Sequence, residues 1–570
     1  MSARVLSNQF DPITFQVLWS RCESIAEEMS NTLVNTAFSS VVRDNHDFAI
    51  GFYDHEGRML AQSQQSTPGQ LGSMHRVMRD FLDVYPLDTL RPGDALITND
   101  PWLGSGHTPD IYVATPVFRD GEAVCFAVNS AHHMDIGGRM SSPDTREVYE
   151  EGVIIPICKL YEQGRPNDTL LRLLERNVRL PHTLLGDLRA QMAANHTGAQ
   201  SVLRFMAQAG LDTLTGLSQA IIAHTERAMR ESIREIPDGS YRHAMTLEDT
   251  DRAGNALAIE VAVTVSGDSV DIDYAGTSGQ VDLPINSVYN MSQAYSLFAI
   301  KCVVHPHIPN NIGSSLPVTV RIPERSLLNP QFPAPVMHRT AIAHYCVEAV
   351  FCALSQAVPD RVLAPGGCYP LWIERFAGRD RDGRRFVVAF NAQGGQGARQ
   401  GGDGVSTTIF PANVGSTSVE LMEAEAPLLC ERKAFAVDSA GAGEYRGGCG
   451  QEVIVRNVSG DEVATSFVGG RFRRGAPGMH GGHAGRIGTI QADGEAPITR
   501  RHGGTLADGR AVRLIYPGGA GFGDPKKRDP ARVLADVREG VVSPESAERD
   551  YAVAVRDGML DDAATMALRG

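Results

Sequence analysis

The chain has 570 residues, more than a single hydrophobic core usually supports, so we expect several domains. Hydrophobic residues make up 42% of it and charged residues 21%, a composition that excludes an intrinsically disordered protein. The 53 Lys and Arg residues against 67 Asp and Glu residues give a net charge of -14, which argues against nucleic acid or an anionic membrane as a partner. The sequence begins without the apolar core of an export signal, and no apolar run is long enough to span a membrane, so a cytoplasmic location is expected.

The N-terminal part of the sequence predicts helices and hairpins in alternation. Asp11 followed by Pro12 is typical of a helix start, and the apolar residues Leu18, Ile25, Met29 and Leu33 follow at helical spacing. Residues 48–52 and 59–61 flank a turn, which predicts a hairpin. This region is therefore expected to be mixed α+β.

The later part of the sequence changes character several times. Residues 183–236 have a helical pattern that Pro-Asp-Gly at 237–239 ends, and residues 240–285 read as β-strands. Of the 58 glycines, 29 lie between Gly394 and Gly523, too many for helix, so turns, bulges and short strands are expected there. Short helices are predicted after residue 530.

These patterns predict an α+β, multidomain fold with a mixed N-terminal domain, a helical middle and a β-rich, Gly-rich C-terminal part. The predicted division is an α+β domain at 1–180, long helices at 181–238, an α+β domain at 239–390, a Gly-rich β region at 391–525 and C-terminal helices at 526–570. The nine cysteines are odd in number, widely spaced and without a C-x-x-C pair, which is typical of reduced core thiols rather than of disulfides or a zinc-thiolate site.

The strongest hairpin signal is formed by residues 111–118 and 123–129, which flank the turn sequence Arg-Asp-Gly-Glu at 119–122. Polar, Gly-containing segments at 99–110 and 129–138 lie at the ends of these two strands. If the hairpin forms, it brings both segments to one end.

A two-residue turn makes opposing positions sum to 241, so Asp110 is expected to face Ala131 and His107 to lie near Met134. The residues that then crowd one end of the hairpin are His107, Asp110, His132 and His133. Two or three imidazoles with a carboxylate suit a first-row divalent metal such as zinc, manganese or iron. The 1–180 domain is thus the predicted metal-binding domain, and a metal there can make a bound water nucleophilic at neutral pH.

The same residues have a plainer interpretation. His-x-x-Asp and His-His occur by chance, and an Asp before a strand is often a turn former. The segment with Asp44, His46 and Asp47 is another polar cluster before a strand, and most such clusters are solvated turns. The sequence contains no phosphate loop, no G-x-S-x-G elbow and no H-E-x-x-H motif, so it supports neither a P-loop ATPase nor a serine hydrolase nor a zincin.

Ten short motifs are spread along nearly the whole chain. They are DPITF at 11–15, 100–110, HHMDIGG at 132–138, EGVI at 151–154, NVR at 177–179, GDLRAQ at 186–191, DYAGTS at 273–278, EAEAPLL at 423–429, YRGG at 445–448 and PGGAGFGDP at 517–525. Together these motifs resemble the hydantoinase B/oxoprolinase family. This family comprises the B-type subunits of ATP-dependent hydantoinases, oxoprolinases and lactamases, with related subunits of acetone and acetophenone carboxylases.

The resemblance implies a metal-dependent subunit of an ATP-dependent cyclic amide hydrolase, which opens a hydantoin, 5-oxoproline or lactam ring. An A-type partner subunit would bind ATP and phosphorylate the substrate, so a hetero-oligomer is expected. Carried over position by position, the ligands of the divalent ion, zinc or manganese, would be Asp44, His107, Asp110 and His132, although the family usually has Glu where this chain has Asp44. His133 or Asp135 is expected to orient a ligand or move a proton.

Two alternatives stay open at this point. The related carboxylases suggest a subunit of an ATP-dependent ketone carboxylase, and none of the residues separates that reaction from amide hydrolysis. A chain whose polar clusters are only turns would instead be a non-catalytic scaffold for its A-type partner.

Overall fold

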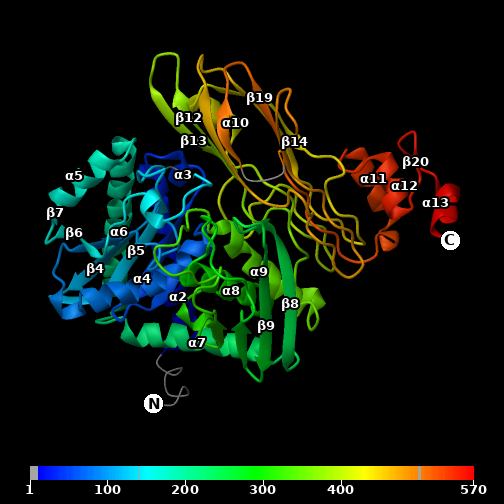
Figure 1. Cartoon of the computed structure of the whole chain (residues 1–570). Coiled ribbons are helices and arrows are strands. Elements are labelled where there is room, and N and C mark those ends of the chain that lie inside the picture. The colour runs from blue at the N-terminus through cyan, green and yellow to red at the C-terminus, as the bar shows by residue number, and fades with distance from the viewer. Residues whose placement is uncertain (1–9, 140–141, 499–501) are drawn as a thin grey trace. The chain divides into compact units, whose positions relative to one another are not determined.

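The structure is a computed structural model that describes residues 10–139, 142–498 and 502–570 (Figure 1). The chain forms two compact units, each with helices and antiparallel sheets, so the predicted α+β, multidomain class is confirmed. Unit 1 contains the chain to Arg242, Glu260–Arg339 and Ala412–Gly415, and unit 2 contains His243–Ile259, Thr340–Pro411 and Ser416–Gly570. Each unit joins segments that are separated in sequence, whereas the five predicted domains are continuous segments. The division into five domains stays a prediction.

Unit 1 is built on a seven-stranded sheet in which all neighbouring strands are antiparallel. In spatial order the strands are β2 (Met59–Gln62), β1 (Phe48–Asp54), β5 (Glu122–His132), β4 (Asp110–Arg119), β3 (Ala95–Thr98), β6 (Cys158–Glu162) and β7 (Arg165–Pro166). The hairpins predicted at 48–61 and 111–129 are therefore confirmed as β1–β2 and β4–β5.

Successive residues of a strand point to opposite sides of the sheet, and apolar side chains lie on both sides here. Helices therefore cover both faces of this sheet. Helix α4 (Pro68–Val84) packs Met74 and Phe81 against a face that includes Tyr112. Helix α6 (Pro181–Ala209) packs Leu184 and Leu188 against the opposite face, which includes Ile111 and Val113. The central strands are consequently buried along most of their length, and Figure 1 shows α4 and α6 beside β4 and β5.

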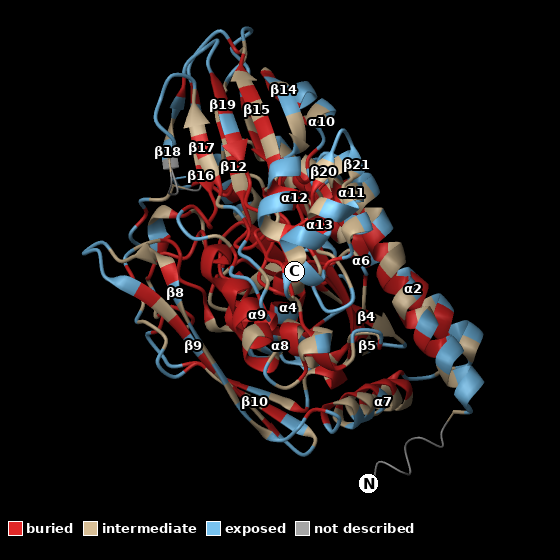
Figure 2. Ribbon diagram, turned by 90° about the vertical axis from the view of Figure 1, so that its right-hand side faces the viewer, coloured by how far each residue is buried: buried red, intermediate tan, exposed pale blue. Residues whose placement is uncertain are grey.

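Helix α2 (Pro12–Thr36) begins where the sequence predicts, because the Asp11 carboxylate accepts hydrogen bonds from the backbone N–H groups of Ile13 and Thr14 at 3.1 Å. Its predicted apolar stripe is buried against α6, so the helix is red on one side and pale blue on the other in Figure 2. The short helix α3 (Ser40–Arg43) follows α2 and leads into β1. Two further helices of unit 1 are α5 (Asp168–Asn177) and α7 (Thr215–Ile233).

A second sheet has the spatial order β11-β10-β9-β8, which confirms the strands predicted at 240–285. Its strands are β8 (Gly239–Thr250), β9 (Ala256–Ser266), β10 (Ser269–Asp273) and β11 (Val318–Arg321). The boundary between the units falls within β8 and β9. Helix α8 (Tyr289–Val304) of unit 1 packs against α4.

Unit 2 contains two four-stranded antiparallel sheets that share one hydrophobic core, and therefore pack face to face. The first has the order β13 (Arg385–Phe390), β12 (Ile373–Arg379), β16 (Val463–Val468) and β18 (His502–Leu506); the second has the order β14 (Leu428–Phe435), β15 (Gln451–Asn457), β19 (Ala511–Ile515) and β17 (Thr489–Ala492). The remaining helices of the unit are α9 (Thr340–Leu354), α10 (Val419–Glu425), α11 (Pro530–Arg538), α12 (Pro544–Tyr551) and α13 (Asp562–Arg569), with a small β20–β21 hairpin (Val555–Arg556 and Met559–Leu560).

The glycines of unit 2 let backbone segments run against one another more closely than a side chain permits. A Cβ atom on Gly395 would lie 1.8 Å from the carbonyl oxygen of Gly448, and one on Gly518 would lie 1.8 Å from that of Ser439. These positions therefore require glycine for steric reasons. The Gly-rich region is thus a folded β region of turns and short strands, as the sequence predicts.

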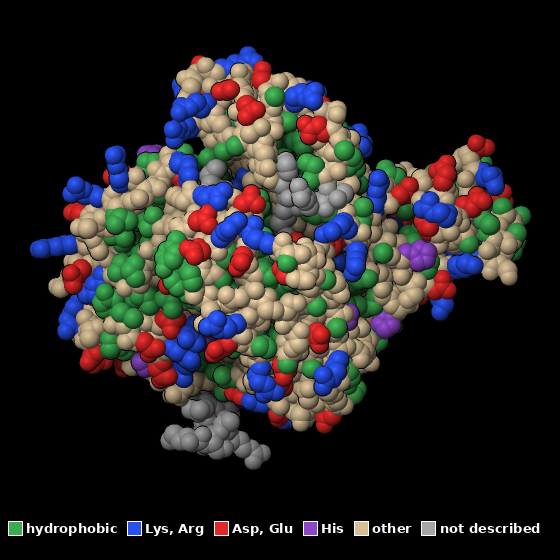
Figure 3. Space-filling model, viewed as in Figure 1, with side chains coloured by type: hydrophobic (Ala, Val, Ile, Leu, Met, Phe, Trp, Pro, Cys, Tyr) green, Lys and Arg blue, Asp and Glu red, His purple; other side chains and the backbone are tan. Residues whose placement is uncertain are grey.

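All nine cysteines are free thiols, as expected. Among the helices of the described residues, none combines the length and the apolar character that crossing a bilayer requires. Acidic and basic side chains are interspersed over the surface seen in Figure 3.

Glu374 on β12 is fully buried in the apolar core of unit 2, and neither carboxyl oxygen has a hydrogen-bond partner among the described residues. Burial raises the pKa of Glu374 well above its ordinary value of 4.5, and the neighbouring Tyr516 hydroxyl opposes that rise only in part. The folded chain therefore holds a proton that the unfolded chain releases above about pH 4.5. Between that pH and the pKa of Glu374 in the folded chain, the free energy of unfolding falls by roughly 1.4 kcal/mol for each pH unit.

We expect Glu374→Gln to be more stable than the wild type at pH 7 by about 2 kcal/mol, and to show less loss of stability as the pH rises from 5 to 8. Urea unfolding at several pH values measures both effects. The exposed Glu462→Gln serves as the control and should leave the profile unchanged. Equal pH slopes for the wild type and Glu374→Gln would show that Glu374 is ionised in the folded chain.

Candidate metal centre

The end of the β4–β5 hairpin places Asp110 directly opposite His132. Asp120 and Gly121 both have positive φ, 52° and 87°, which confirms the predicted two-residue turn. The predicted pairing of Asp110 with Ala131 is wrong, because a bulge between Val117 and Phe118 shifts the register by one residue. The shift turns Asp110 and His132 to the same face of the hairpin.

The loop before β4 carries His107 toward this pair. Asn99 fixes the loop, since its side-chain amide donates to the carbonyl of Thr108 at 2.7 Å and its oxygen accepts from the backbone N–H of Ile155. Gly106 has a φ of 87°, and a Cβ atom there would lie 2.8 Å from the Val288 side chain. The chain can therefore make this turn only with glycine. His107 lies beside His132, with the centres of the two rings 5.0 Å apart.

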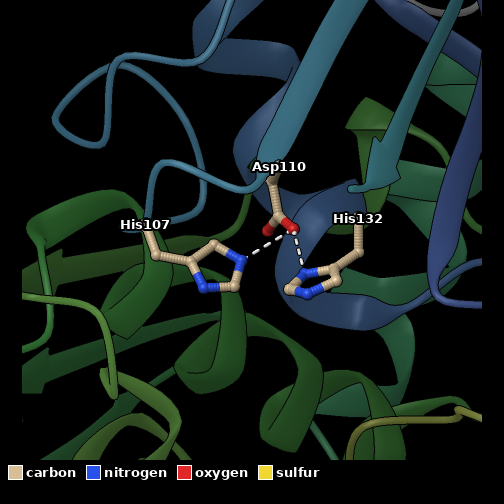
Figure 4. Close-up of side chains that lie close together, drawn as sticks. All are labelled: His107, Asp110 and His132. Atoms are coloured by element: carbon tan, nitrogen blue, oxygen red, sulfur yellow. Dashed lines mark hydrogen bonds and ion pairs between the residues drawn. The ribbon is translucent and has the colours of Figure 1, made fainter. Parts of the chain in front are cut away.

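His107, Asp110 and His132 form a buried cluster at this hairpin end (Figure 4). The Oδ1 atom of Asp110 lies 2.7 Å from Nε2 of His107 and 3.0 Å from Nδ1 of His132. Each residue offers one ligand atom, and the three ligand atoms all lie within 4.8 Å of one another. The sequence thus predicted correctly that these three residues come together.

Arg339 completes the cluster and was not predicted. Its Nη2 donates to Oδ2 of Asp110 at 2.9 Å, its Nη1 to Nδ1 of His107 at 2.7 Å, and its Nε to the carbonyl of Ser105 at 2.7 Å. The Ser105 hydroxyl also donates to Oδ2 of Asp110. Arg339 lies 229 residues beyond Asp110 in a segment without a motif, so no sequence signal pointed to it.

The electrostatics of the cluster put the negative charge on Asp110 and leave His107 neutral. Burial lowers the pKa of His107 to about 3, and Arg339 contributes in the same direction. Burial by itself would raise the pKa of Asp110, but His107 and Arg339 beside it bring that pKa well below its ordinary value. The buried carboxylate is thus compensated by donors on both oxygens.

Asp44 does not belong to this cluster. It pairs with Arg43 at 2.7 Å, and its side chain is 38% exposed. Asp47, three residues later, lies closer to the cluster: its Oδ2 is 3.8 Å from Nδ1 of His132, and its Oδ1 accepts from Gln70 at 2.7 Å. Asp47 stands immediately before β1, which pairs with β5 and so brings it beside the hairpin end.

The structure places His133 and Asp135 outside the cluster. The Nε2 atom of His133 lies 3.1 Å from the amide oxygen of Gln191, and its Nδ1 is buried without a hydrogen-bond partner among the described residues. The Asp135 carboxylate accepts from the backbone N–H groups of Gly137, Arg179 and Leu180 and pairs with the Arg179 guanidinium at 2.9 Å. These bonds tie the end of the hairpin to the start of α6, so Asp135 has a positioning role in the fold.

The cluster fits a divalent cation by the chemistry of its donors. A metal takes neutral imidazoles and ionised carboxylates, which is the protonation state that burial favours for His107 and that the neighbouring groups favour for Asp110. Nε2 of His107 is buried and has no well-formed hydrogen bond among the described residues, although it lies beside the Asp110 carboxylate. Two imidazoles and a carboxylate are typical ligands of zinc and manganese.

The chain is similar to known proteins over nearly its whole length. The family described as hydantoinase B/oxoprolinase matches residues 11–525. A protein from Pseudomonas sp. (strain NS671), named as the putative B-type subunit of a D-/L-hydantoinase, is 31% identical over 96% of each chain. The beta subunit of the caprolactamase of Pseudomonas jessenii is 33% identical over 99% of each chain.

Two solved structures resemble the fold. The crystal structure of the ATP-dependent caprolactamase from Pseudomonas jessenii matches with a TM-score of 0.91 and 31% identity, over 99% of this chain and 100% of that chain. A nucleotide-free structure of acetone carboxylase matches with a TM-score of 0.87 and 20% identity, over 100% of this chain and 83% of that chain. The second likeness shows the fold alone.

Proposed function

Because the chain belongs to the hydantoinase B/oxoprolinase family, we propose that it is the metal-dependent subunit of an ATP-dependent cyclic amide hydrolase. The substrate class is a hydantoin, 5-oxoproline or lactam ring that an ATP-binding A-type partner subunit phosphorylates on its carbonyl oxygen. The observation that carries the proposal is the buried cluster of His107, Asp110 and His132, whose ligand atoms converge within 4.8 Å. Relatives named as the B-type subunit of a hydantoinase and the beta subunit of a caprolactamase support the substrate class and the partner.

The residues of the chain have distinct tasks in this scheme. His107, Asp110 and His132 would hold the ion, and Asp47 is the fourth candidate ligand because its carboxylate lies 3.8 Å from Nδ1 of His132. A bound divalent ion supplies a water that is nucleophilic at neutral pH. An amide resists attack because its carbonyl is electron-rich and its leaving group poor, and phosphorylation of the oxygen addresses both.

His133 is the candidate for proton transfer. Burial lowers the pKa of this imidazole, and its Nδ1 has no hydrogen-bond partner among the described residues, so a neutral ring nitrogen is available to accept a proton. Asp135 was the other candidate. Its oxygens already accept four hydrogen bonds from protein groups, which favours its positioning role over proton transfer.

Two measurements test the function. Elemental analysis of protein purified without chelator should give about one zinc or manganese per chain. With the A-type partner and ATP, cyclic amides should be hydrolysed, whereas a ketone with bicarbonate should give no product. Less than a tenth of an equivalent of metal would favour a scaffold, and turnover of the ketone would favour a carboxylase.

The fourth ligand can be identified by a matched pair of substitutions. We expect Asp47→Asn to weaken metal binding by more than roughly 100-fold, because loss of a ligand exceeds the effect of losing a contact that only supports one. Asp44→Asn should bind metal like the wild type, since Asp44 pairs with Arg43 outside the cluster. Competitive titration with a metal chelator measures both affinities. The reverse result would establish Asp44 as the ligand that the family resemblance implies.

A further inference from the structure

Arg339 is buried, and all three of its hydrogen bonds to the protein are made within the candidate metal centre. A guanidinium has five N–H groups and accepts no hydrogen bond. Three of these groups reach Ser105, His107 and Asp110, which leaves two without a partner among the described residues. Arg339 therefore has donor capacity that this chain does not use.

The contact between Arg339 and His107 conflicts with metal ligation by His107. Because Arg339 only donates, Nδ1 of His107 must present its lone pair, and the proton of the neutral ring is then on Nε2, the nitrogen that faces Asp110. His107 can give its Nε2 lone pair to a cation only in the tautomer with the proton on Nδ1. That proton would point at the Arg339 N–H, so the bond between the two residues cannot persist.

Ligation by His107 thus frees a third N–H of a buried guanidinium. A buried donor that loses its acceptor is unfavourable, so Arg339 then requires a new oxygen. The planar, forked guanidinium matches phosphate and carboxylate oxygens well. The reaction of the proposed function brings such a group to this site, namely the phosphoryl group on the activated carbonyl oxygen.

We infer that Arg339 binds the phosphoryl oxygens of the activated substrate and thereby couples substrate binding to metal binding. The inference rests on the proposed metal centre. If the cation releases Arg339 for the oxyanion, each of the two ligands must strengthen the binding of the other by the same factor. A residue that only braces the loop would produce no such coupling.

Calorimetric titration of the metal-stripped chain with manganese and with inorganic phosphate tests this. In the wild type we expect phosphate to bind on the order of 10-fold more tightly with manganese present, and manganese to gain by the same factor with phosphate present. Arg339→Met should still bind manganese but lose the coupling. Arg339→Lys keeps a positive charge beside Asp110 and should retain a smaller coupling; it is the variant to measure if Arg339→Met does not fold.

Arg179→Met is the matched control, because Arg179 pairs with Asp135 after the same hairpin but does not touch the cluster. It should keep the full coupling. Coupling of wild-type size in Arg339→Met and Arg339→Lys would overturn this inference but not the proposed metal centre. A wild-type chain that binds manganese but shows no coupling would do the same. A wild-type chain that binds no manganese or zinc would overturn the proposed metal centre as well.

Discussion

His107→Ala is expected to remove stoichiometric metal and to reduce ATP-dependent amide hydrolysis by more than roughly 100-fold, since loss of a ligand exceeds the effect of losing its supporting contacts. The fold should persist. Arg339 keeps its bonds to Asp110 and to the carbonyl of Ser105, so the Asp110 carboxylate stays compensated when the imidazole is gone. Elemental analysis and turnover with the A-type partner measure the two effects.

The control is His196→Ala, which removes an exposed imidazole from α6 in the same unit. It should leave both the metal content and the rate unchanged. Full activity of His107→Ala without bound metal would refute the metal-dependent mechanism. Retention of one equivalent of metal would show that His107 is not a ligand.

Arg471→Met is expected to destabilise the chain by about 3 to 5 kcal/mol. Arg471 forms a buried ion pair with Glu348 of α9, a helix that is buried along almost its whole length (Figure 2). The guanidinium also lies over the ring of Tyr345, 5.2 Å from its centre. Without Arg471, a carboxyl group stays buried with no opposite charge, which is one of the largest destabilising changes that a substitution can make.

The destabilisation by Arg471→Met depends on pH, and its sign follows from the pKa of Glu348. Burial raises the pKa of Glu348, and Arg471 opposes that rise in the native chain. In Arg471→Met the pKa rises further, so the folded variant must take up a proton that the unfolded chain has released. The destabilisation should therefore be larger at pH 8 than at pH 5.

Urea unfolding at both pH values measures the effect. Arg474→Met, an exposed change three residues away, should stay within about 0.5 kcal/mol of the wild type. The double variant Arg471→Met, Glu348→Met should recover part of the stability, because it removes the uncompensated carboxyl group. If Arg471→Met were as stable as the wild type at pH 8, the ion pair between Arg471 and Glu348 would make no net contribution to stability.

Local sequence determined the β4–β5 hairpin and most of the candidate metal centre. Alternating apolar residues around Asp-Gly specify two strands and a tight turn, and the polar residues at the strand ends have to meet once the strands pair. The same holds for α2, which begins at Asp11 because a side-chain cap acts within one turn. These features depend on neighbours in the chain, so their signals are visible in the sequence.

Tertiary structure decided which partners complete the site. The bulge after Val117 pairs Asp110 with His132, and strand β1 brings Asp47, rather than Asp44, beside His132. Arg339 reaches the cluster from more than two hundred residues away in the sequence. The Asp135 carboxylate accepts a hydrogen bond from the backbone N–H of Leu180, just before α6. Such contacts arise from the packing of distant segments, which leaves no periodic pattern, so a single sequence determines the ligand types but not the full set of groups around them.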